Sequence, residues 1–505
     1  MALCTASQFQ NLTLFGASAL SFSTSSHLNL SFNVAAEQNH YAKNVTGLDV
    51  CEVIITYTHP GYNDEVNTIV WLPKSENWLG RFLGAGGGGW VTGAENSTLA
   101  WAASEGFAVA TTDGGHLAES PVQDWALLSP GNINWIPLQN FASTTLDEAA
   151  TLGKAVAEAY YGMKPLYSYW NGCSTGGRQG HMMAQRYPDQ YDGILASASA
   201  MQWGQMLMQE GWPQAIMNDL SDAELYPTNC ELEAVRLAAI EACDGLDGVE
   251  DGIITLPGQC NFDPSTKVGQ SYYCSLTKAN TTITEAAATI AKWTWKGATS
   301  SRNESLWYGL DVGASFLADA ATTCSANGTC TGAPLGFFDI WVRYFLTMDP
   351  EFDMSTVNVS VFSKLFHQSV NRYDSIIGTS DIDLTYFKEA GGKLITWHGL
   401  ADSLIAPNTT VDYAQQVYER DPGAGEYYRF FEAPGVDHCG GGSGWFPGSG
   451  LQSLIDWVEK GVAPTRLGAQ TQTGAVKRSA DLCLWPKSLH FVSGDINAAD
   501  SFECR

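Results

Sequence analysis

The chain has little positive charge, and little charge of either sign. Only 16 % of its 505 residues are charged, and 26 lysines and arginines stand against 53 aspartates and glutamates, a formal net charge of −27. A surface of this sign repels the phosphates of nucleic acids and anionic membranes. We therefore expect neither nucleic acid nor membrane partners. The sequence leaves the oligomeric state open.

Long apolar runs are also absent. The segment Leu12–Leu20 is too short and too polar for the core of a signal peptide or for a membrane span, and no basic stretch precedes it. We expect the chain to begin near the mature end of a secreted protein whose signal peptide has been removed. Neither of its two glycine clusters matches a dinucleotide-binding or P-loop fingerprint, and no internal repeat is visible.

Zinc-type clusters of cysteine or histidine are missing, although the chain has twelve cysteines. Most cysteines form pairs at short or moderate separation: Cys243 and Cys260, Cys324 and Cys330, Cys483 and Cys504. Disulfides are also expected for Cys4 and Cys51, while Cys230 and Cys274 could pair with each other. Nine Asn-x-Ser/Thr sequons begin at Asn11, Asn29, Asn44, Asn96, Asn280, Asn303, Asn327, Asn358 and Asn408. Paired cysteines and sequons together predict a secreted, extracellular glycoprotein.

Strand and helix patterns alternate along most of the chain. A hairpin is predicted around Pro60-Gly61, and buried strands are predicted at Arg81–Gly84, Phe107–Thr111, Leu166–Trp170, Lys393–Trp397 and Tyr427–Phe431. A helix is predicted over 143–160, with Thr145 and Glu148 as a capping box. This alternation predicts an α/β fold with a mostly parallel sheet.

The middle of the chain differs from its two ends. Over residues 201–375 the alternation fades, and cysteines, sequons and large apolar residues accumulate. The chain is also longer than one compact core usually needs. We therefore predict a discontinuous catalytic domain at 1–200 and 376–505, with a Cys-dense, loop-rich lid domain at 201–375 inserted into it.

A nucleophile motif follows one of the predicted strands. Gly172-Cys173-Ser174-Thr175-Gly176 has the Gly-x-Ser-x-Gly spacing, which a serine on a tight strand-to-helix turn requires. Ser174 is the candidate nucleophile, and the N–H group of Thr175 is a candidate donor to an oxyanion. The competing interpretation is a glycine-rich turn that contains a serine by chance.

A second oxyanion donor is expected from a glycine loop after an earlier strand. Four adjacent glycines, Gly86–Gly89, follow the predicted strand at Arg81–Gly84, and we take Gly88 as the candidate donor. Glycine lets the backbone approach a ligand that a side chain would block. A flexible surface turn is the alternative.

Three histidines are candidates for the general base. His438 lies in a glycine-flanked loop after a late strand, His398 lies at a strand end, and His116 follows a Gly-Gly turn. In α/β-hydrolases the chain order is Ser, then Asp or Glu, then His, and Asp402 followed by His438 fits it. Asp437 fits poorly, because a sequence neighbour cannot easily orient the imidazole of His438.

Two cysteines flank the candidate serine and histidine. Cys173 precedes Ser174, and Cys439 follows His438. If Ser174 and His438 meet at about 3 Å, their neighbours come near the disulfide range of about 4.4–6.8 Å between Cα atoms. A thiolate mechanism through Cys173 is the alternative, but the even cysteine count favours pairing.

These motifs resemble those of a known family. The Cys-Ser pair, the later Asp and the His-Cys pair are similar to the signature of the tannase and feruloyl esterase family, as is the stretch Tyr169–Gly193. The resemblance extends over almost the whole chain, lid included. It implies an α/β-hydrolase fold with a lid, hydrolysis of aromatic-acid esters, a triad of Ser174, Asp402 and His438, and a Cys173–Cys439 bridge.

An acidic segment near the start of the lid points to calcium. Four carboxylates fall within the eight residues 244–251, and hard oxygen ligands at this density suit Ca²⁺, although the spacing is not that of an EF-hand. The family's calcium-binding lids resemble this segment. That resemblance implies the side chains of Asp244, Asp247 and Asp251 and the carbonyls of Val249 and Ile253 as ligands. A solvated acidic turn held by a Cys243–Cys260 bridge is the alternative.

The expected function is therefore that of a secreted serine esterase that releases hydroxycinnamic acids of the feruloyl type from plant cell-wall polysaccharide such as xylan. A tannase acting on galloyl esters is the second hypothesis. A third, of another class, is a catalytically inactive, calcium-stabilised binding protein on a hydrolase fold. The choice of acyl group depends on lid side chains that the sequence does not place.

Overall fold

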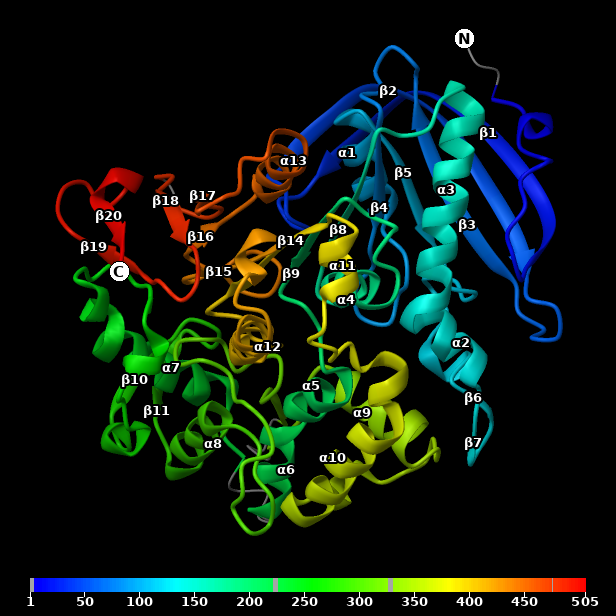
Figure 1. Ribbon diagram of the computed structural model, residues 1–505. Coiled ribbons are helices and arrows are strands. Elements are labelled where there is room, and N and C mark those ends of the chain that lie inside the picture. The colour runs from blue at the N-terminus through cyan, green and yellow to red at the C-terminus, as the bar shows by residue number, and fades with distance from the viewer. Residues whose placement is uncertain (1–3, 221–225, 326–329, 475) are drawn as a thin grey trace.

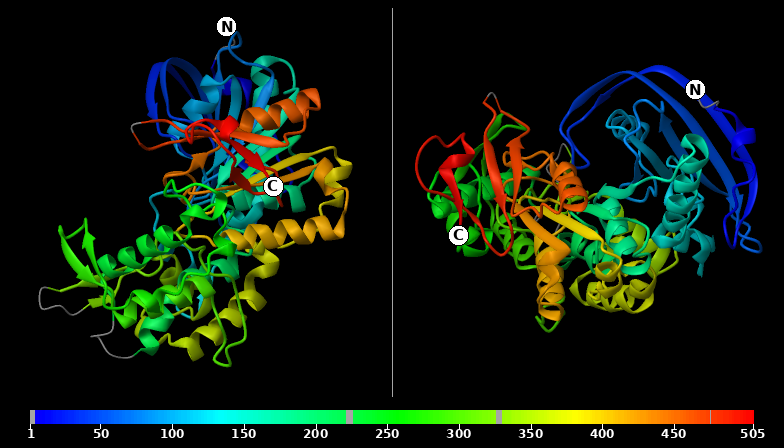
Figure 2. Two further views of the ribbon diagram at one scale, coloured as in Figure 1. Left: turned by 90° about the vertical axis from the view of Figure 1, so that its left-hand side faces the viewer. Right: turned by 45° about the horizontal axis from the view of Figure 1, so that its top comes forward.

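The computed structural model describes residues 4–220, 226–325, 330–474 and 476–505, so the sequon at Asn327 lies outside the described residues. The chain forms a body around one large sheet and a mass of helices beside it (Figure 1). A second view shows the helical mass, green to yellow, protruding from one end of the body (Figure 2).

Within the described residues, the central sheet has nine strands in the order β1-β2-β3-β5-β4-β8-β9-β14-β15. Their bounds are β1 Ser18–Val34, β2 Lys43–Thr58, β3 Val66–Pro73, β4 Arg81–Ala85, β5 Phe107–Thr112, β8 Tyr167–Cys173, β9 Gly193–Ser197, β14 Lys393–Gly399 and β15 Tyr428–Ala433. Pairing is antiparallel from β1 to β5 and parallel from β5 to β15. The predicted α/β fold with a mostly parallel sheet is confirmed.

The predicted strands all join this sheet, and the predicted hairpin is the β2–β3 pair. Their apolar runs are buried because helices cover both faces of a parallel sheet. The sequence patterns missed β9, which has only five residues, and β1, whose serine-rich sequence is exposed along most of its length.

Helices pack against both faces of the sheet and build the lid. Their bounds are α1 Asn96–Ser104, α2 Trp135–Gln139, α3 Thr145–Tyr161, α4 Thr175–Arg186, α5 Trp203–Glu210, α6 Trp212–Asp219, α7 Asn229–Cys243, α8 Glu285–Lys296, α9 Phe337–Ile340, α10 Val359–Tyr373, α11 Thr385–Glu389, α12 Pro407–Arg420 and α13 Gly450–Lys460. Three π-helical segments, Asn140–Thr144, Trp341–Leu346 and Asp374–Gly378, continue α2, α9 and α10. None of the helices in the described ranges has the length and apolarity to cross a membrane.

The predicted capping box at the start of α3 is wrong. The chain before Thr145 is already helical, so the first N–H groups of α3 need no side-chain cap. The Thr145 hydroxyl donates to the carbonyl of Asn140 instead, at 2.8 Å. Glu148 points to the sheet, where its carboxylate accepts hydrogen bonds from Tyr57 and His59.

Between β9 and β14, no described residue adds a strand to the central sheet. This region, the predicted lid, contains α5 to α10 and two small hairpins, β10 Ser271–Cys274 with β11 Ala279–Thr282 and β12 Thr322–Cys324 with β13 Cys330–Gly332. It is more helical than the predicted loop-rich lid. The boundaries at 201 and 375 stay a prediction.

An aromatic cluster joins the helical region to the body. Trp90, which follows the glycine loop, stacks on Phe345 with ring centroids 5.2 Å apart and meets the edge of Trp203 at the same distance. Trp341 stacks against Phe345 at 4.9 Å. These rings belong to one buried core, which extends from the glycine loop into the lid helices.

Small antiparallel strands complete the fold: β6 Leu127–Ser129 with β7 Asn132–Ile133, β16 Trp445–Phe446 with β17 Arg466–Thr471 and β18 Ser479–Cys483, and β19 Leu489–Phe491 with β20 Phe502–Cys504. All twelve cysteines are paired, as Cys4–Cys51, Cys173–Cys439, Cys230–Cys274, Cys243–Cys260, Cys324–Cys330 and Cys483–Cys504. Cys173 is therefore no thiolate, and Cys230 does pair with Cys274.

Candidate active site

Ser174 lies on a strained turn between β8 and α4. Its backbone has φ 60° and ψ −123°, a conformation that a non-glycine residue adopts only when its surroundings enforce it. The two glycines of the motif permit the turn, because a Cβ atom on Gly172 would lie 2.5 Å from the carbonyl of Gly176. The pentapeptide thus forms a strand-to-helix elbow that presents a half-buried serine.

Strand β9, helix α4 and the segment just before the lid hold this elbow in place. The N–H group of Ser174 donates to the carbonyl of Ser197 at the end of β9, at 3.0 Å. The carbonyl of Ser174 accepts from the N–H groups of Arg178 in α4, at 2.9 Å, and of Ala200, at 3.1 Å. The backbone of Ser174 is therefore fixed on both sides.

The glycine loop after β4 lies directly against the elbow. The N–H group of Gly176 donates to the carbonyl of Gly87 at 3.0 Å, and that of Gly87 donates to Oε1 of Gln179 at 3.1 Å. The N–H groups of Thr175 and Gly88 donate to no group within the described residues. Two unoccupied donors from two loops are what an oxyanion hole requires. No local sequence pattern marks the supporting role of Gln179.

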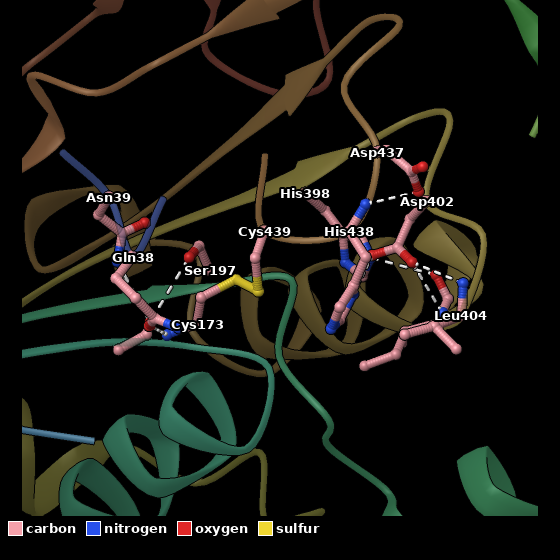
Figure 3. The surroundings of a disulfide bond; sticks show 12 residues. Gln38, Asn39, Cys173, Ser197, His398, Asp402, Leu404, Asp437, His438 and Cys439 are labelled. Atoms are coloured by element: carbon pink, nitrogen blue, oxygen red, sulfur yellow. Dashed lines mark hydrogen bonds and ion pairs between the residues drawn. A yellow bond between two sulfur atoms is a disulfide. The ribbon is translucent and has the colours of Figure 1, made fainter. Parts of the chain in front are cut away.

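Asp402 and His438 are hydrogen-bonded, with 2.8 Å between Oδ2 of Asp402 and Nδ1 of His438 (Figure 3). The other oxygen of Asp402 accepts from the N–H groups of Leu404 and Ile405, each at 2.9 Å. Nε2 of His398 lies 3.1 Å from Oδ2. The bond from Asp402 to Nδ1 leaves Nε2 of His438 available to act as a base toward a serine hydroxyl.

The charges of this group stabilise one another. Burial alone would raise the pKa of Asp402, but the charges and hydrogen bonds of His438 and His398 hold it far below its ordinary value. Burial would lower the pKa of His438, but Asp402 and, more weakly, Asp437 raise it above its ordinary value. Asp402 is therefore ionised and supports an imidazolium ion at His438.

The other residues considered as base or acid make contacts of a different kind. His398 is fully buried on Asp402, and its Nδ1 atom bonds the Thr410 hydroxyl at 2.7 Å, so it supports the acid and is no second base. His116 stacks on Trp125 at 4.6 Å, and its Nε2 atom lies 3.2 Å from the carbonyl of Trp90. The Asp437 carboxylate accepts the backbone N–H of His438 at 2.7 Å and so shapes its loop without touching its ring.

The Cys173–Cys439 disulfide connects the end of β8 to the loop after β15, with 5.8 Å between Cα atoms (Figure 3). Because Ser174 and His438 are the next residues, the bridge ties the nucleophile loop to the base loop. Gln38 supports it from the β1–β2 connection, where its Oε1 atom accepts the N–H of Cys173 at 3.3 Å. Nothing in the sequence pattern pointed to Gln38.

The acidic loop predicted to bind calcium wraps its backbone around its own carboxylates. Asp244 accepts from the N–H groups of residues 251–253, at 2.8 to 3.2 Å. Asp247 accepts from the N–H of Val249 at 3.2 Å and from the hydroxyl of Thr255 at 2.9 Å. The loop is therefore folded around its carboxylates rather than extended into solvent.

Asp251 is the most electrostatically strained carboxylate of this loop. Its side chain is fully buried and pairs with Arg478 at 2.8 Å. Burial, with the charges of Asp244 and Asp247, still raises the pKa of Asp251 to about 6. Among the described residues, no three His, Cys, Asp or Glu side chains are grouped as metal ligands. The oxygen-only donor set nevertheless fits calcium better than zinc or other N/S-liganded metals.

Comparison with known proteins agrees with this geometry. The family described as "Tannase and feruloyl esterase" matches residues 51–505. A "Probable feruloyl esterase" from Arthroderma benhamiae is 44 % identical over 469 residues, which cover 91 % of this chain and 86 % of the relative. A "Tannase" from Aspergillus oryzae is 29 % identical, and the alignment covers 88 % of this chain and 83 % of the tannase chain.

A solved structure, "Tannin acyl hydrolase from Aspergillus niger", superposes with a TM-score of 0.90 at 27 % identity and covers 99 % of this chain and 95 % of its own. The family match, the identity and the superposition all extend across the lid as well as the body. The chain therefore belongs to the tannase and feruloyl esterase family.

Proposed function

We propose that the protein is a feruloyl esterase-like carboxylic ester hydrolase in which Ser174, His438 and Asp402 form the catalytic triad. The observation that carries the proposal is the Cys173–Cys439 bridge, which ties a serine on a strained elbow to a histidine already bonded to a buried carboxylate. A structural serine would need none of these features together. They also argue against an inactive binding protein, which has no use for an ionised acid behind a histidine.

Acylation begins when Nε2 of His438 takes the proton of the Ser174 hydroxyl and Oγ attacks the ester carbonyl. The carbonyl π electrons move to oxygen, and the N–H groups of Thr175 and Gly88 stabilise this oxyanion. The imidazolium of His438, stabilised by Asp402, then protonates the alcohol oxygen as the C–O bond breaks. The alcohol leaves, and the acyl group stays on Ser174.

Deacylation repeats these steps with water. His438 takes a proton from water, the hydroxide oxygen attacks the acyl carbonyl, and the same N–H groups stabilise the oxyanion. When the intermediate collapses, the proton returns from His438 to Ser174 and the carboxylic acid is released. No step needs a redox partner or a metal.

We infer hydroxycinnamoyl esters of the feruloyl type, attached to plant cell-wall polysaccharide such as xylan, as substrates. The inference is supported by the name of the relative at 44 % identity, a probable feruloyl esterase. The high superposition on a tannin acyl hydrolase favours galloyl esters as the second candidate. The two acyl groups differ in length between ring and carbonyl and in ring hydroxylation.

Rates on methyl ferulate, methyl caffeate and methyl gallate separate these candidates. A feruloyl esterase should show its highest kcat/KM on methyl ferulate or caffeate, with methyl gallate at least tenfold lower. A preference for methyl gallate would replace the feruloyl assignment by tannase. Hydrolysis of none of the three, in folded protein, would contradict the esterase assignment.

We also propose that the acidic loop holds one structural calcium ion through the side chains of Asp244, Asp247 and Asp251 and the carbonyls of Val249 and Ile253. The support is the density of oxygen ligands, among which the side chains of Asp247 and Asp251 are buried, and a single arginine balances their negative charge only in part. When bound, calcium would supply the positive charge that this loop lacks. Its contribution is to stability, because no atom of the loop belongs to the triad.

We also propose that the protein is secreted, because of its disulfides and its glycosylation sequons. Six disulfides form in an oxidising compartment rather than in the cytosol. Of the described sequons, all except Asn358 have an exposed asparagine, as N-glycans require. Endoglycosidase treatment of protein from a secreting host tests this directly, and an unchanged mass would contradict glycosylation.

A further inference from the structure

The connection between β1 and β2 lies against the end of β8. Two of its residues, Gln38 and Asn39, have left-handed backbones, with φ 48° and 69°. Asn39 is fully buried and Gln38 is half-buried. Residues other than glycine occupy this region at a cost in free energy, so two in succession are held there by their surroundings.

The side chain of Asn39 joins two strands that are not neighbours. Its Nδ2 atom donates to Oδ1 of Asn171 at 2.8 Å and to the carbonyl of Gly172 at 3.3 Å, both in β8. Its Oδ1 atom accepts from Nε1 of Trp397 in β14, at 2.8 Å. Strand β9 lies between β8 and β14 in the sheet. One amide therefore ties the strand that leads to the candidate nucleophile to the strand that leads to the candidate acid.

Gln38 adds a second attachment to β8. Its carbonyl accepts from Nδ2 of Asn171 at 2.9 Å, and its Oε1 atom accepts the N–H of Cys173 at 3.3 Å (Figure 3). Asn171 is 2 % exposed, so its amide is withdrawn from water together with that of Asn39. Buried amides that are bonded in this way favour a single arrangement, because a shift leaves a donor or an acceptor unpaired.

The same connection reaches the loop of the candidate base. The carbonyl of Ala36 accepts from Nε2 of Gln472 at 2.6 Å. Oε1 of Gln472 accepts from the N–H of Gly441, three residues after His438. Residues 36–39 are therefore attached to the supports of the candidate nucleophile, acid and base at once, although none of these three residues is in this part of the chain.

We propose that residues 36–39 form a strap that fixes the three members of the triad relative to one another, with Asn39 as its positioning residue. The inference rests on the proposed ester hydrolysis and adds a buried group that acts through the strands and not on the reacting atoms. The Cys173–Cys439 bridge ties the nucleophile loop to the base loop, and Asn39 ties the nucleophile strand to the acid strand. Without Asn39, we expect the ends of β8 and β14 to lose their fixed separation.

The test compares kcat and KM for p-nitrophenyl acetate in the full-length wild type and in Asn39→Gly. Glycine adopts a left-handed backbone readily and lacks the amide, so the variant removes the bonds and keeps the conformation. The rate at which phenylmethanesulfonyl fluoride labels Ser174 is followed in parallel. Because small misplacements of reacting groups are costly, kcat and the labelling rate should fall at least about fivefold, with KM changed less than about threefold. A smaller loss of kcat would overturn the proposal.

A double-variant cycle tests the bond that crosses β9. Trp397→Phe keeps an aromatic ring but removes the Nε1 donor to Asn39. It should lower kcat in the wild-type background and add little in Asn39→Gly, because the bond is already lost there. No loss from Trp397→Phe alone, or losses that multiply in the double variant, would overturn the proposal.

The matched control is Asn218→Ala. Asn218, in the lid helix α6, likewise donates from Nδ2 to two carbonyls, at 3.1 Å each, and accepts from the hydroxyl of Tyr226 at 3.0 Å. Its loss should lower the melting temperature and leave kcat near that of wild type, and an equal loss of kcat would overturn the proposal. Circular dichroism checks folding. If Asn39→Gly does not fold, Asn39→Asp, which lacks the Nδ2 donor to β8, takes its place.

Hydrogen exchange followed by mass spectrometry gives a readout that needs no activity. Peptides that contain the ends of β8 and β14 should exchange faster in Asn39→Gly than in wild type, and at the wild-type rate in Asn218→Ala. Absence of this difference would overturn the strap, whatever the esterase activity. A folded wild type that neither hydrolyses esters nor reacts with phenylmethanesulfonyl fluoride would instead overturn the esterase assignment, while faster exchange at both strand ends would still support the strap.

Discussion

Asp402 and Asp251 both have fully buried side chains, but their surroundings differ in charge. Asp402 has two histidines and two backbone N–H groups, and its pKa lies far below the ordinary value. Asp251 has one arginine, one backbone N–H donor from Ile253 and two acidic neighbours, and its pKa is raised to about 6. Groups of the chain balance the negative charge of Asp402, whereas they balance that of Asp251 only in part.

This difference separates chemistry from stability. A buried anion must be neutralised by hydrogen bonds, a cation or a proton. At Asp402 the chain supplies everything, so the proposed triad is preorganised and needs no added ion. In the acidic loop the excess negative charge is what a bound calcium ion would neutralise. Changes at the first site should therefore affect rate, and changes at the second should affect melting temperature.

The largest effect on rate is expected from Ser174→Ala. Loss of a triad nucleophile costs about 10⁶-fold in kcat, whereas a half-buried hydroxyl contributes little to folding. The variant should keep the melting temperature and the calcium content of wild type. Steady-state rates on p-nitrophenyl acetate and thermal unfolding measure both. Activity within tenfold of wild type would contradict the assignment of Ser174.

Most of the geometry of the proposed catalytic site could be predicted because its signals are local. Gly172 and Gly176 flank the serine as a tight elbow demands, and four adjacent glycines mark the second loop. The cysteines beside Ser174 and His438 carry long-range information, since they connect two loops that are 266 residues apart. The fold class likewise follows from the period of the apolar residues.

Other features could not be predicted because they depend on contacts distant in sequence. Gln179 supports the glycine loop and His398 supports Asp402, but neither has a local pattern that assigns this role. The capping box at Thr145 was wrong because a π-helical turn precedes α3, and the recruitment of Glu148 by His59 is visible only in three dimensions.

The second-largest effect is expected from the double variant Cys173→Ala/Cys439→Ala. Without the bridge, the loops of Ser174 and His438 lose their fixed register, and a misplacement of about 1 Å costs on the order of 10²-fold in rate. The matched control is Cys483→Ala/Cys504→Ala, which removes a bridge between C-terminal strands and should leave kcat near that of wild type.

Circular dichroism must show that both double variants remain folded. Equal losses of kcat in the two variants would indicate a general effect on stability and would contradict a specific role for the Cys173–Cys439 bridge. Mass spectrometry of a non-reduced digest checks the pairing itself, and a free thiol at Cys173 would contradict it.

Calcium removal should affect stability and leave the chemistry intact. Chelation with EDTA should lower the melting temperature by several degrees, and Asp247→Asn should give the same decrease without added chelator. Glu250→Gln is the matched control, because Glu250 lies in the same segment but is exposed and outside the proposed ligand set. Below the melting transition, kcat should change less than twofold. Metal analysis that finds no calcium in untreated protein would contradict the proposal.

The smallest effect on rate is expected from changes at His398, whose Nε2 atom is hydrogen-bonded to Asp402. His398→Asn keeps an acceptor toward Thr410 but loses the donor to Asp402, whereas His398→Gln can retain that donor. Without it, the Asp402 carboxylate becomes more basic and the pKa of His438 rises further. The acid limb of kcat/KM should therefore move up by a few tenths of a pH unit in His398→Asn and stay in place in His398→Gln.

The same pair of variants tests the linkage between Asp402 and folding. Because the folded-state pKa of Asp402 is lowered, its interactions stabilise the protein above the unfolded-state pKa of about 3.9, and this contribution is lost as pH falls through the folded-state value. Loss of one donor to a buried charge costs about 1–3 kcal/mol. In urea titrations, His398→Asn should therefore be less stable than His398→Gln by about this amount at pH 6, and the difference should shrink as pH falls below about 4. A difference that is independent of pH would assign the loss to packing around His398 rather than to the charge of Asp402.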